Sequence, residues 1–187
     1  TNGTLTVTKD NTGVELTVED YSGVYDGEAH SVSNETVTGA VEGTVWTYQY
    51  RLSETDEWSD TKPDFTNVTA EGAVTVYVKA SNANYEDLFA NATVEITKRP
   101  VTLKSASASK AYDGTPLTKH EMATYEGFVK EEGVDIAYSG TQTEVGSSAN
   151  TYTYEPKTGT NLNNYEVSAT NGTLTVTKDN TGVELTV

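Results

Sequence analysis

The sequence predicts a mostly β fold, arranged as two tandem small antiparallel β domains with at most one short helical turn. Three observations support this prediction. Apolar residues alternate with polar ones at a period of two, turn-forming Asp-Gly and Asn-Gly pairs separate the alternating runs, and no window shows the spacing of an amphipathic helix over three turns. An immunoglobulin-like sandwich and a β-grasp-like fold both fit this pattern.

The alternation is clearest in three segments. Apolar residues occupy every second position from Val74 to Val78 and in the pair Val94 and Ile96, and aromatic rings do so from Trp46 to Tyr50. Such runs are typical of strands that bury one face, and rings and β-branched residues suit a pleated surface. The one helical candidate is residues 128–132, a single turn that Gly133 could close in a left-handed conformation.

An identical repeat predicts the domain organisation. Residues 1–18 read TNGTLTVTKDNTGVELTV, and the same eighteen letters return at residues 170–187, which indicates a tandem array. We interpret residues 1–9 as the last strand of an absent preceding repeat and residues 179–187 as the start of the next one. The first β repeat domain then spans residues 10–98 and the second spans 99–178. We expect residues 1–9 to fray or to pair with an open sheet edge of a neighbouring molecule.

A weaker repeat relates the two predicted domains to each other. The motif Tyr25-Asp26-Gly27 recurs 87 residues later as Tyr112-Asp113-Gly114. The later motif Asn84-Tyr85-Glu86 recurs only 80 residues on, as Asn164-Tyr165-Glu166. This drop in the shift is expected of related domains that differ in loop length.

The composition excludes several classes of function. The chain carries 12 Lys and Arg against 28 Asp and Glu, for a formal net charge of −16, and it has no cysteine. Because a phosphate backbone is bound by clustered cations, we expect no nucleic-acid partner. No run of 18 apolar residues occurs, so we expect no membrane insertion in this segment. The lack of cysteine excludes disulfides and cysteine nucleophiles.

The two Tyr-Asp-Gly motifs are the most conspicuous short patterns. We interpret them as structural turns, in which the glycine takes a positive φ and the aspartate accepts hydrogen bonds from nearby amides. The residues concerned are Tyr25, Asp26, Gly27, Tyr112, Asp113 and Gly114. The other interpretation makes the two aspartates ligands or acids. However, His30 and His120 follow them at different distances and no nucleophile-elbow sequence is present, so we expect no catalytic residues.

The best candidate for a ligand contact is the acidic segment 53–60 with its single tryptophan. Aromatic rings stack on sugars and carboxylates accept hydrogen bonds from hydroxyls, so Trp58, Asp56 and Asp60 are the predicted ligand-binding residues. An exposed Trp58 beside other rings would favour binding, and a buried one would favour a structural role. Acidic clusters could also chelate calcium, but no D-x-D-x-D-G loop is present, and we predict no cofactor and no metal site.

The order of the motifs resembles the MBG and YDG repeat families of bacterial surface proteins. The matching segments are VYDGEAH at 24–30, VYVKASNANY at 76–85, ITKRPVTL at 96–103, KAYDGTPL at 110–117, YEGFV at 125–129 and GTLTVTK at 172–178. The resemblance implies small, mostly antiparallel domains strung along large adhesin-like proteins, often of Gram-positive bacteria and often anchored to the cell wall. It implies no catalytic residues.

The repeat and the resemblance together predict a structural stalk or spacer of a secreted cell-surface adhesin. We expect it to be extracellular, at the cell surface, with a cell-wall anchor outside this segment. Its partners would be neighbouring copies of the same repeat. The alternative is a weak multivalent module whose partner is a host or cell-surface glycan or mucin.

Overall fold

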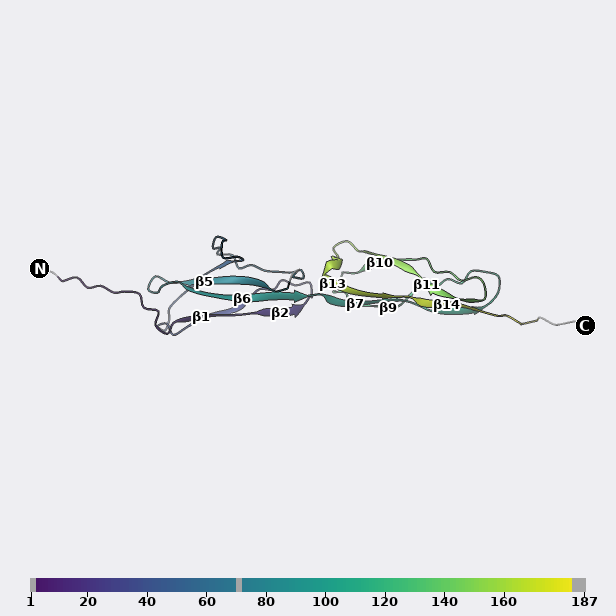
Figure 1. Cartoon of the computed structure of the whole chain (residues 1–187), viewed down its shortest axis with the longest axis horizontal. Coiled ribbons are helices and arrows are strands. Elements are labelled where there is room, and N and C mark those ends of the chain that lie inside the picture. The colour runs from purple at the N-terminus through teal and green to yellow at the C-terminus, as the bar shows by residue number, and fades with distance from the viewer. Residues whose placement is uncertain (1–2, 70–71, 183–187) are drawn as a thin grey trace, which may run out of the picture. The chain divides into compact units, whose positions relative to one another are not determined.

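The computed structural model describes residues 3–69 and 72–182, and the chain divides into two compact units, Thr1–Thr97 and Lys98–Val187 (Figure 1). In the described residues all regular structure is β strand, apart from one short 3₁₀ turn. The predicted mostly β class is therefore confirmed.

In residues 3–69 and 72–97 of the first unit the structure has six strands. They are β1 (Glu15–Glu19), β2 (Tyr21–Val24), β3 (Ser33–Thr38), β4 (Thr47–Arg51), β5 (Val74–Ser81) and β6 (Leu88–Thr97). Strands β1 and β3 pair with each other, and the other four form a sheet in the order β2-β6-β5-β4. The alternating runs around Val76 and Val94 lie in the central strands β5 and β6, where both side chains are fully buried. Burying such side chains is the main term that stabilises the unit.

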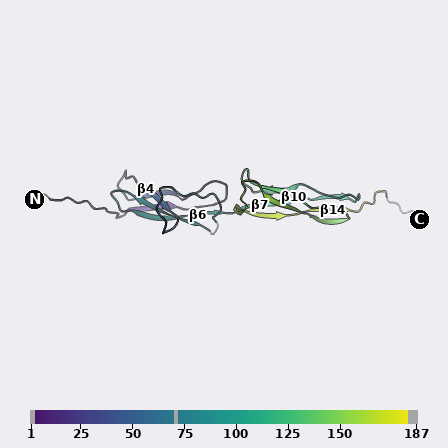
Figure 2. The same cartoon turned by 90° about the horizontal axis from the view of Figure 1, so that it is seen from above.

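The described part of the second unit, residues 98–182, contains eight strands and the 3₁₀ turn. They are β7 (Arg99–Ser105), β8 (Ala108–Ala111), β9 (Met122–Glu126), β10 (Val134–Tyr138), β11 (Gly146–Asn150), β12 (Tyr152–Pro156), η1 (Leu162–Asn164), β13 (Tyr165–Thr170) and β14 (Gly172–Thr177). Three sheets result, in the orders β11-β14-β8, β13-β7-β9 and β10-β12. One strand of each sheet, β14, β7 and β10, is labelled in Figure 2. Leu103 of β7 and Leu174 of β14 are fully buried in the core.

The helical turn lies at η1 and not at the predicted residues 128–132. In the predicted segment the Glu132 amide donates to the Val129 carbonyl over 3.1 Å, but Glu131 takes a φ of 70°. A left-handed residue inside the segment ends helical geometry at once, so only a tight turn forms. At η1 the Asn161 side chain accepts a hydrogen bond from the Asn163 amide and caps the turn.

Both units contain a parallel pairing that brings their beginning next to their end. In the first unit β2 pairs in parallel with β6, from Tyr21 opposite Val94 to Val24 opposite Thr97. In the second unit β8 pairs in parallel with β14, from Ala108 opposite Leu174 to Ala111 opposite Thr177. The repeat shifts of 87 and 80 residues convert the first register into the second. We call β2 with β6, and β8 with β14, the terminal strand pairs.

The two copies of the identical repeat lie in different surroundings. Residues 3–9 form no strand, and Leu5 and Val7 are 99% and 97% exposed. Their counterparts Leu174 and Val176 lie in β14 and are 0% and 1% exposed. Of the predicted start of the next repeat, residues 179–187, the last five lie outside the described residues.

Candidate functional site

The Tyr-Asp-Gly motif of the first unit forms a tight turn at the end of β2. Gly27 has a φ of 84°, and the Asp26 carboxylate accepts hydrogen bonds from the Glu28 amide and the His30 ring, both over 2.9 Å. The hydrogen bond from His30 is the largest of the effects that lower the pKa of Asp26. The His30 ring also stacks on Tyr21 at 4.1 Å between centroids. The Asp26 carboxylate and the His30 ring thus both stabilise the turn.

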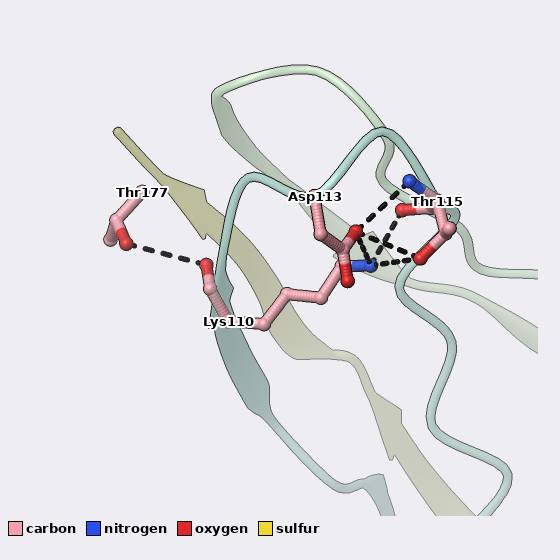
Figure 3. Close-up of polar contacts among 4 residues, drawn as sticks. All are labelled: Lys110, Asp113, Thr115 and Thr177. Carbon is pink, nitrogen blue, oxygen red and sulfur yellow. Dashed lines mark hydrogen bonds and ion pairs between the residues drawn. The ribbon is translucent and has the colours of Figure 1, made fainter. Parts of the chain in front are cut away.

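The corresponding turn of the second unit uses a lysine where the first uses a histidine. Figure 3 shows the Asp113 carboxylate accepting from the Lys110 ammonium over 2.6 Å and from the amide and hydroxyl of Thr115 over 2.9 and 2.8 Å. These bonds, led by that of Lys110, hold the pKa of Asp113 well below its usual range. Gly114 has a φ of 76°. An aspartate so engaged stays a carboxylate at neutral pH and cannot act as a general acid.

Each turn is attached to the last residue of its unit's last strand. The Tyr25 amide donates to the Thr97 carbonyl over 2.9 Å, and the Tyr112 amide donates to the Thr177 carbonyl over 2.8 Å. These bonds continue the terminal strand pairs by one step. The motif therefore closes the ladder between the second and last strands of a unit, which the sequence alone did not indicate.

The predicted ligand-binding residue Trp58 is half-buried and is approached by cations of its own chain. The Arg51 guanidinium carbon lies over the indole at 4.4 Å from the centroid, and the Lys79 ammonium lies over it at 5.1 Å. The Phe89 ring, 64% exposed, packs beside it at 5.8 Å between centroids. Cation–π contacts of this kind attach the acidic loop to β4 and β5.

The two predicted acidic partners do not join Trp58 around one pocket. Asp60 accepts a hydrogen bond from the Gln49 side chain over 2.8 Å. Asp56 borders an open groove of about 310 Å³ that neither Trp58 nor Asp60 lines. The residues lining it are Tyr50, Arg51, Leu52, Asp56, Glu57, Ser59, Thr61 and Pro63. Ligand binding by the three predicted residues remains a prediction.

An ion pair that also involves Tyr50, one of the residues lining this groove, lies in the first unit. The Glu35 carboxylate contacts the Lys62 ammonium over 2.6 Å and accepts from the Tyr50 hydroxyl over 3.2 Å. Burial raises the pKa of Glu35, but the hydrogen bond from Lys62 and further favourable contacts together lower the pKa more. Burial, and then the Glu35 charge, raise the pKa of Tyr50 to about 12. The arrangement is an ion pair to which the Tyr50 hydroxyl adds a hydrogen bond.

The described residues offer neither a metal-binding cluster nor a helix that could span a membrane. In residues 3–69 and 72–182 there is no group of three or more His, Asp or Glu side chains placed to hold a metal ion. The same ranges contain no helix with the length and apolar character needed to cross a membrane.

The comparison with protein families decides the nature of the second unit. Residues 100–175, from β7 to the middle of β14, match the MBG domain family of the YGX type. The second unit is an MBG domain. This match confirms the MBG part of the family resemblance, and it makes the unit a repeat domain of the type found in surface proteins, which is a structural and non-catalytic domain type. A search of curated proteins finds no match to the chain.

The first unit shares features with the MBG domain although the family match does not cover it. Its terminal strand pair has the same register after the repeat shifts, and its Tyr-Asp-Gly turn donates the same backbone bond to the last strand. Strand β3 pairs with β1 with a register shift, as β9 does with β7 in the MBG domain. The two units thus share these strand pairings and the Tyr-Asp-Gly turn.

Proposed function

We propose that this chain is a structural spacer of a secreted cell-surface adhesin, which projects a distal binding region from the cell. The observation that carries the proposal is the terminal strand pair of each unit, β2 with β6 and β8 with β14. A spacer must withstand tension between its two ends, and these pairs lie on the direct path between them.

Parallel strands respond to such tension in a particular way. Force that enters at the beginning of a unit pulls its first two strands backward, and force that leaves at the end pulls its last strand forward. Because the second strand and the last strand are adjacent and parallel, they are drawn past each other along their length, and all hydrogen bonds between them share the force. An antiparallel hairpin pulled at its open end would instead break its bonds one after another.

The beginning of each unit has further attachments to the rest of that unit. In the MBG domain β7, which precedes β8, also pairs in parallel with β13, from Arg99 opposite Tyr165 to Lys104 opposite Thr170. In the first unit Asp20, between β1 and β2, accepts from the Thr93 amide over 2.6 Å and from its hydroxyl over 3.0 Å. These arrangements connect the beginning of the second unit to its last-but-one strand, β13, and the beginning of the first unit to its last strand, β6.

The surroundings of Trp58 support a spacer over a glycan-binding module. A sugar ring stacks flat on an indole, so it needs a face of the ring to itself. Arg51 and Lys79 both lie over this ring and Phe89 lies beside it. The contacts by which a sugar would bind are thus partly made within the chain.

A binding assay tests the spacer against the adhesive alternative. The full chain, biotinylated and tetramerised on streptavidin, is applied to immobilised mucin and a broad glycan panel, with and without calcium. Tetramers are needed because a single site of millimolar affinity would escape detection. We expect no saturable binding. Saturable binding that Trp58→Ala abolishes, and that the exposed-residue control Val41→Ala retains, would overturn the spacer proposal in favour of a lectin-like repeat.

A further inference from the structure

We propose that an open groove of the first unit binds a trimethylammonium group, as carried by choline. The groove is lined by β3, by the start of β4 and by the segment that joins them, and it measures about 360 Å³. It shares no lining residue with the groove that Asp56 borders. Sites for small ligands typically measure about 300–1,000 Å³. This inference does not rest on the spacer proposal, because it concerns the lining of one groove and not the path of force.

The first step is the aromatic wall of the groove. Trp46 and Tyr48 both line it, because alternate residues of a strand point to the same face of the sheet. The Tyr48 hydroxyl donates a hydrogen bond to the Glu35 carbonyl over 3.2 Å, and this bond attaches the ring to β3. Val37, Ala40 and Val41 add aliphatic surface to the lining. The wall thus combines two π faces with methyl groups.

The second step is that the chain does not supply a cation of its own to this wall. In residues 3–69 and 72–182 the cation–π contacts are made to Trp58 and Tyr77, and none is made to Trp46. The indole of Trp58 is already covered by Arg51 and Lys79. Trp46 therefore retains the attraction for a cation that Trp58 satisfies within the chain.

The third step is that the rim of the groove is held in place without a ligand. The Val41 amide donates to the Tyr85 hydroxyl over 3.0 Å, and the Tyr85 ring packs on Trp46 at 5.2 Å between centroids. The Val41 carbonyl accepts from the amide and the hydroxyl of Thr44, over 3.1 and 2.6 Å. A ligand that enters a fixed groove does not have to order it, so more of the contact energy appears as affinity.

The fourth step is the sign of the charge around the groove. Among the described residues the lining contains the two carboxylates Glu35 and Glu42 and no Lys or Arg side chain. Burial, and then the Glu35 charge, raise the pKa of Tyr48, so this charge acts on the wall. The Lys62 ammonium offsets part of it, but Glu42 is exposed and has no ion-pair partner in the described residues. The groove therefore favours a cation and disfavours an anion.

The fifth step distinguishes a trimethylammonium group from a primary ammonium. A primary ammonium carries three donors, each of which needs an acceptor when it leaves water. The acceptors at hand are already in use, because the Glu35 carboxylate accepts from Lys62 and Tyr50 and the Val41 carbonyl accepts twice from Thr44. A trimethylammonium group has no N–H to satisfy and presents methyl groups to the aromatic and aliphatic wall.

A titration followed by nuclear magnetic resonance tests the inference on the full, isotope-labelled chain. The probe is choline chloride, and sodium chloride at equal ionic strength is the blank. We expect saturable shifts of the Gly43 and Thr44 amide signals with a Kd of about 1–10 mM. The uncharged carbon isostere of choline, in which a tert-butyl group replaces the trimethylammonium, should bind about tenfold more weakly. Phosphocholine is titrated in parallel, and whichever of the two binds more tightly identifies the source of the group.

Two variants locate the binding in this groove. Trp46→Leu, which keeps apolar bulk but removes the π face, should weaken choline binding about tenfold, and a dispersed amide spectrum shows that the variant is folded. Glu42→Gln leaves the core untouched and should weaken binding about threefold, whereas Glu54→Gln, an exposed carboxylate of the same unit outside the groove, should not. The inference is wrong if choline causes no saturable shift in the millimolar range or if the uncharged isostere binds equally well. It is also wrong if Glu42→Gln and Glu54→Gln bind choline alike.

Discussion

Leu174→Asp should unfold the MBG domain, whereas Leu5→Asp should leave the stability of the chain unchanged. The two leucines occupy the same place in identical segments, but Leu174 is fully buried and Leu5 is 99% exposed. Truncating a buried leucine costs about 2–5 kcal/mol, and an unpaired buried carboxylate costs more. Because domains are stable by only about 5–15 kcal/mol, this one substitution should consume most of the domain's stability.

The two tryptophans make the experiment specific for one unit. Both lie in the first unit, at Trp46 and Trp58, so their fluorescence follows that unit alone while far-ultraviolet circular dichroism follows both. Urea titrations of Leu174→Asp should show the fluorescence transition preserved and part of the dichroism transition missing. A stability loss in Leu5→Asp equal to that in Leu174→Asp would contradict the burial difference on which the account rests.

Gly127→Ala should destabilise the MBG domain by about 2–5 kcal/mol, a sum of backbone strain and steric conflict. Gly127 follows β9 with a φ of 106°, and an added Cβ would clash with the Pro100 carbonyl oxygen and lie 2.9 Å from the Val101 Cα. Backbone atoms of a central strand cannot move aside as a flexible side chain would. The change in the free energy of unfolding is measured by urea titration, from the part of the dichroism transition that tryptophan fluorescence does not follow.

Gly114→Ala is the matched control for this substitution. Gly114 also has a positive φ, 76°, but an added Cβ would meet nothing within 4 Å. It should therefore show only the strain of the left-handed conformation, about 1–2 kcal/mol. Equal losses in the two variants would show that the close approach to β7 is unimportant. The first unit repeats the feature, since a Cβ on Gly39 after β3 would meet the Gly13 carbonyl oxygen.

The strands were predictable from sequence because their signal is local. Alternation around Val76 and Val94 reflects which side chains face the core, and it requires no knowledge of the partner strand. The same holds for the turns. Asp10 and Asp179, in the two copies of the identical repeat, each accept a hydrogen bond from the amide two residues on, because the Asx turn needs only its own residues.

The partners of the strands were not predictable, because pairing is decided at long range. Identical residues form a buried strand at 172–177 and no strand at 3–8, so the sequence of a segment does not determine its neighbours. Alternation likewise does not reveal that β2 pairs in parallel with β6. Once one register is known, however, the two repeat shifts give the other.

The surroundings of Trp58 show the same limit for the candidate site. Its neighbours in sequence are polar and acidic, which made the ring a candidate ligand contact but left open whether it is exposed or buried. The cations over the ring come from Arg51 on β4 and Lys79 on β5, and only the pairing of those strands brings them together. The predicted helical turn at residues 128–132 was wrong for a local reason. Glu131, inside the segment, adopts the left-handed conformation that the prediction assigned to Gly133 at its end.

The direction dependence of mechanical unfolding tests the central claim most directly. Single chains are pulled through their two ends, which draws β8 and β14 past each other. In a second geometry, handles on Ala111→Cys and Thr177→Cys, which are register partners, separate the same strands from one end. The double-cysteine chain is also pulled through its ends, to show that the substitutions do not weaken it. At equal loading rate the MBG domain should unfold at a clearly higher force through its ends, since unfolding under force is governed by the barrier that the shared bonds raise. Equal forces in the two directions, or a lower force through the ends, would contradict the spacer account.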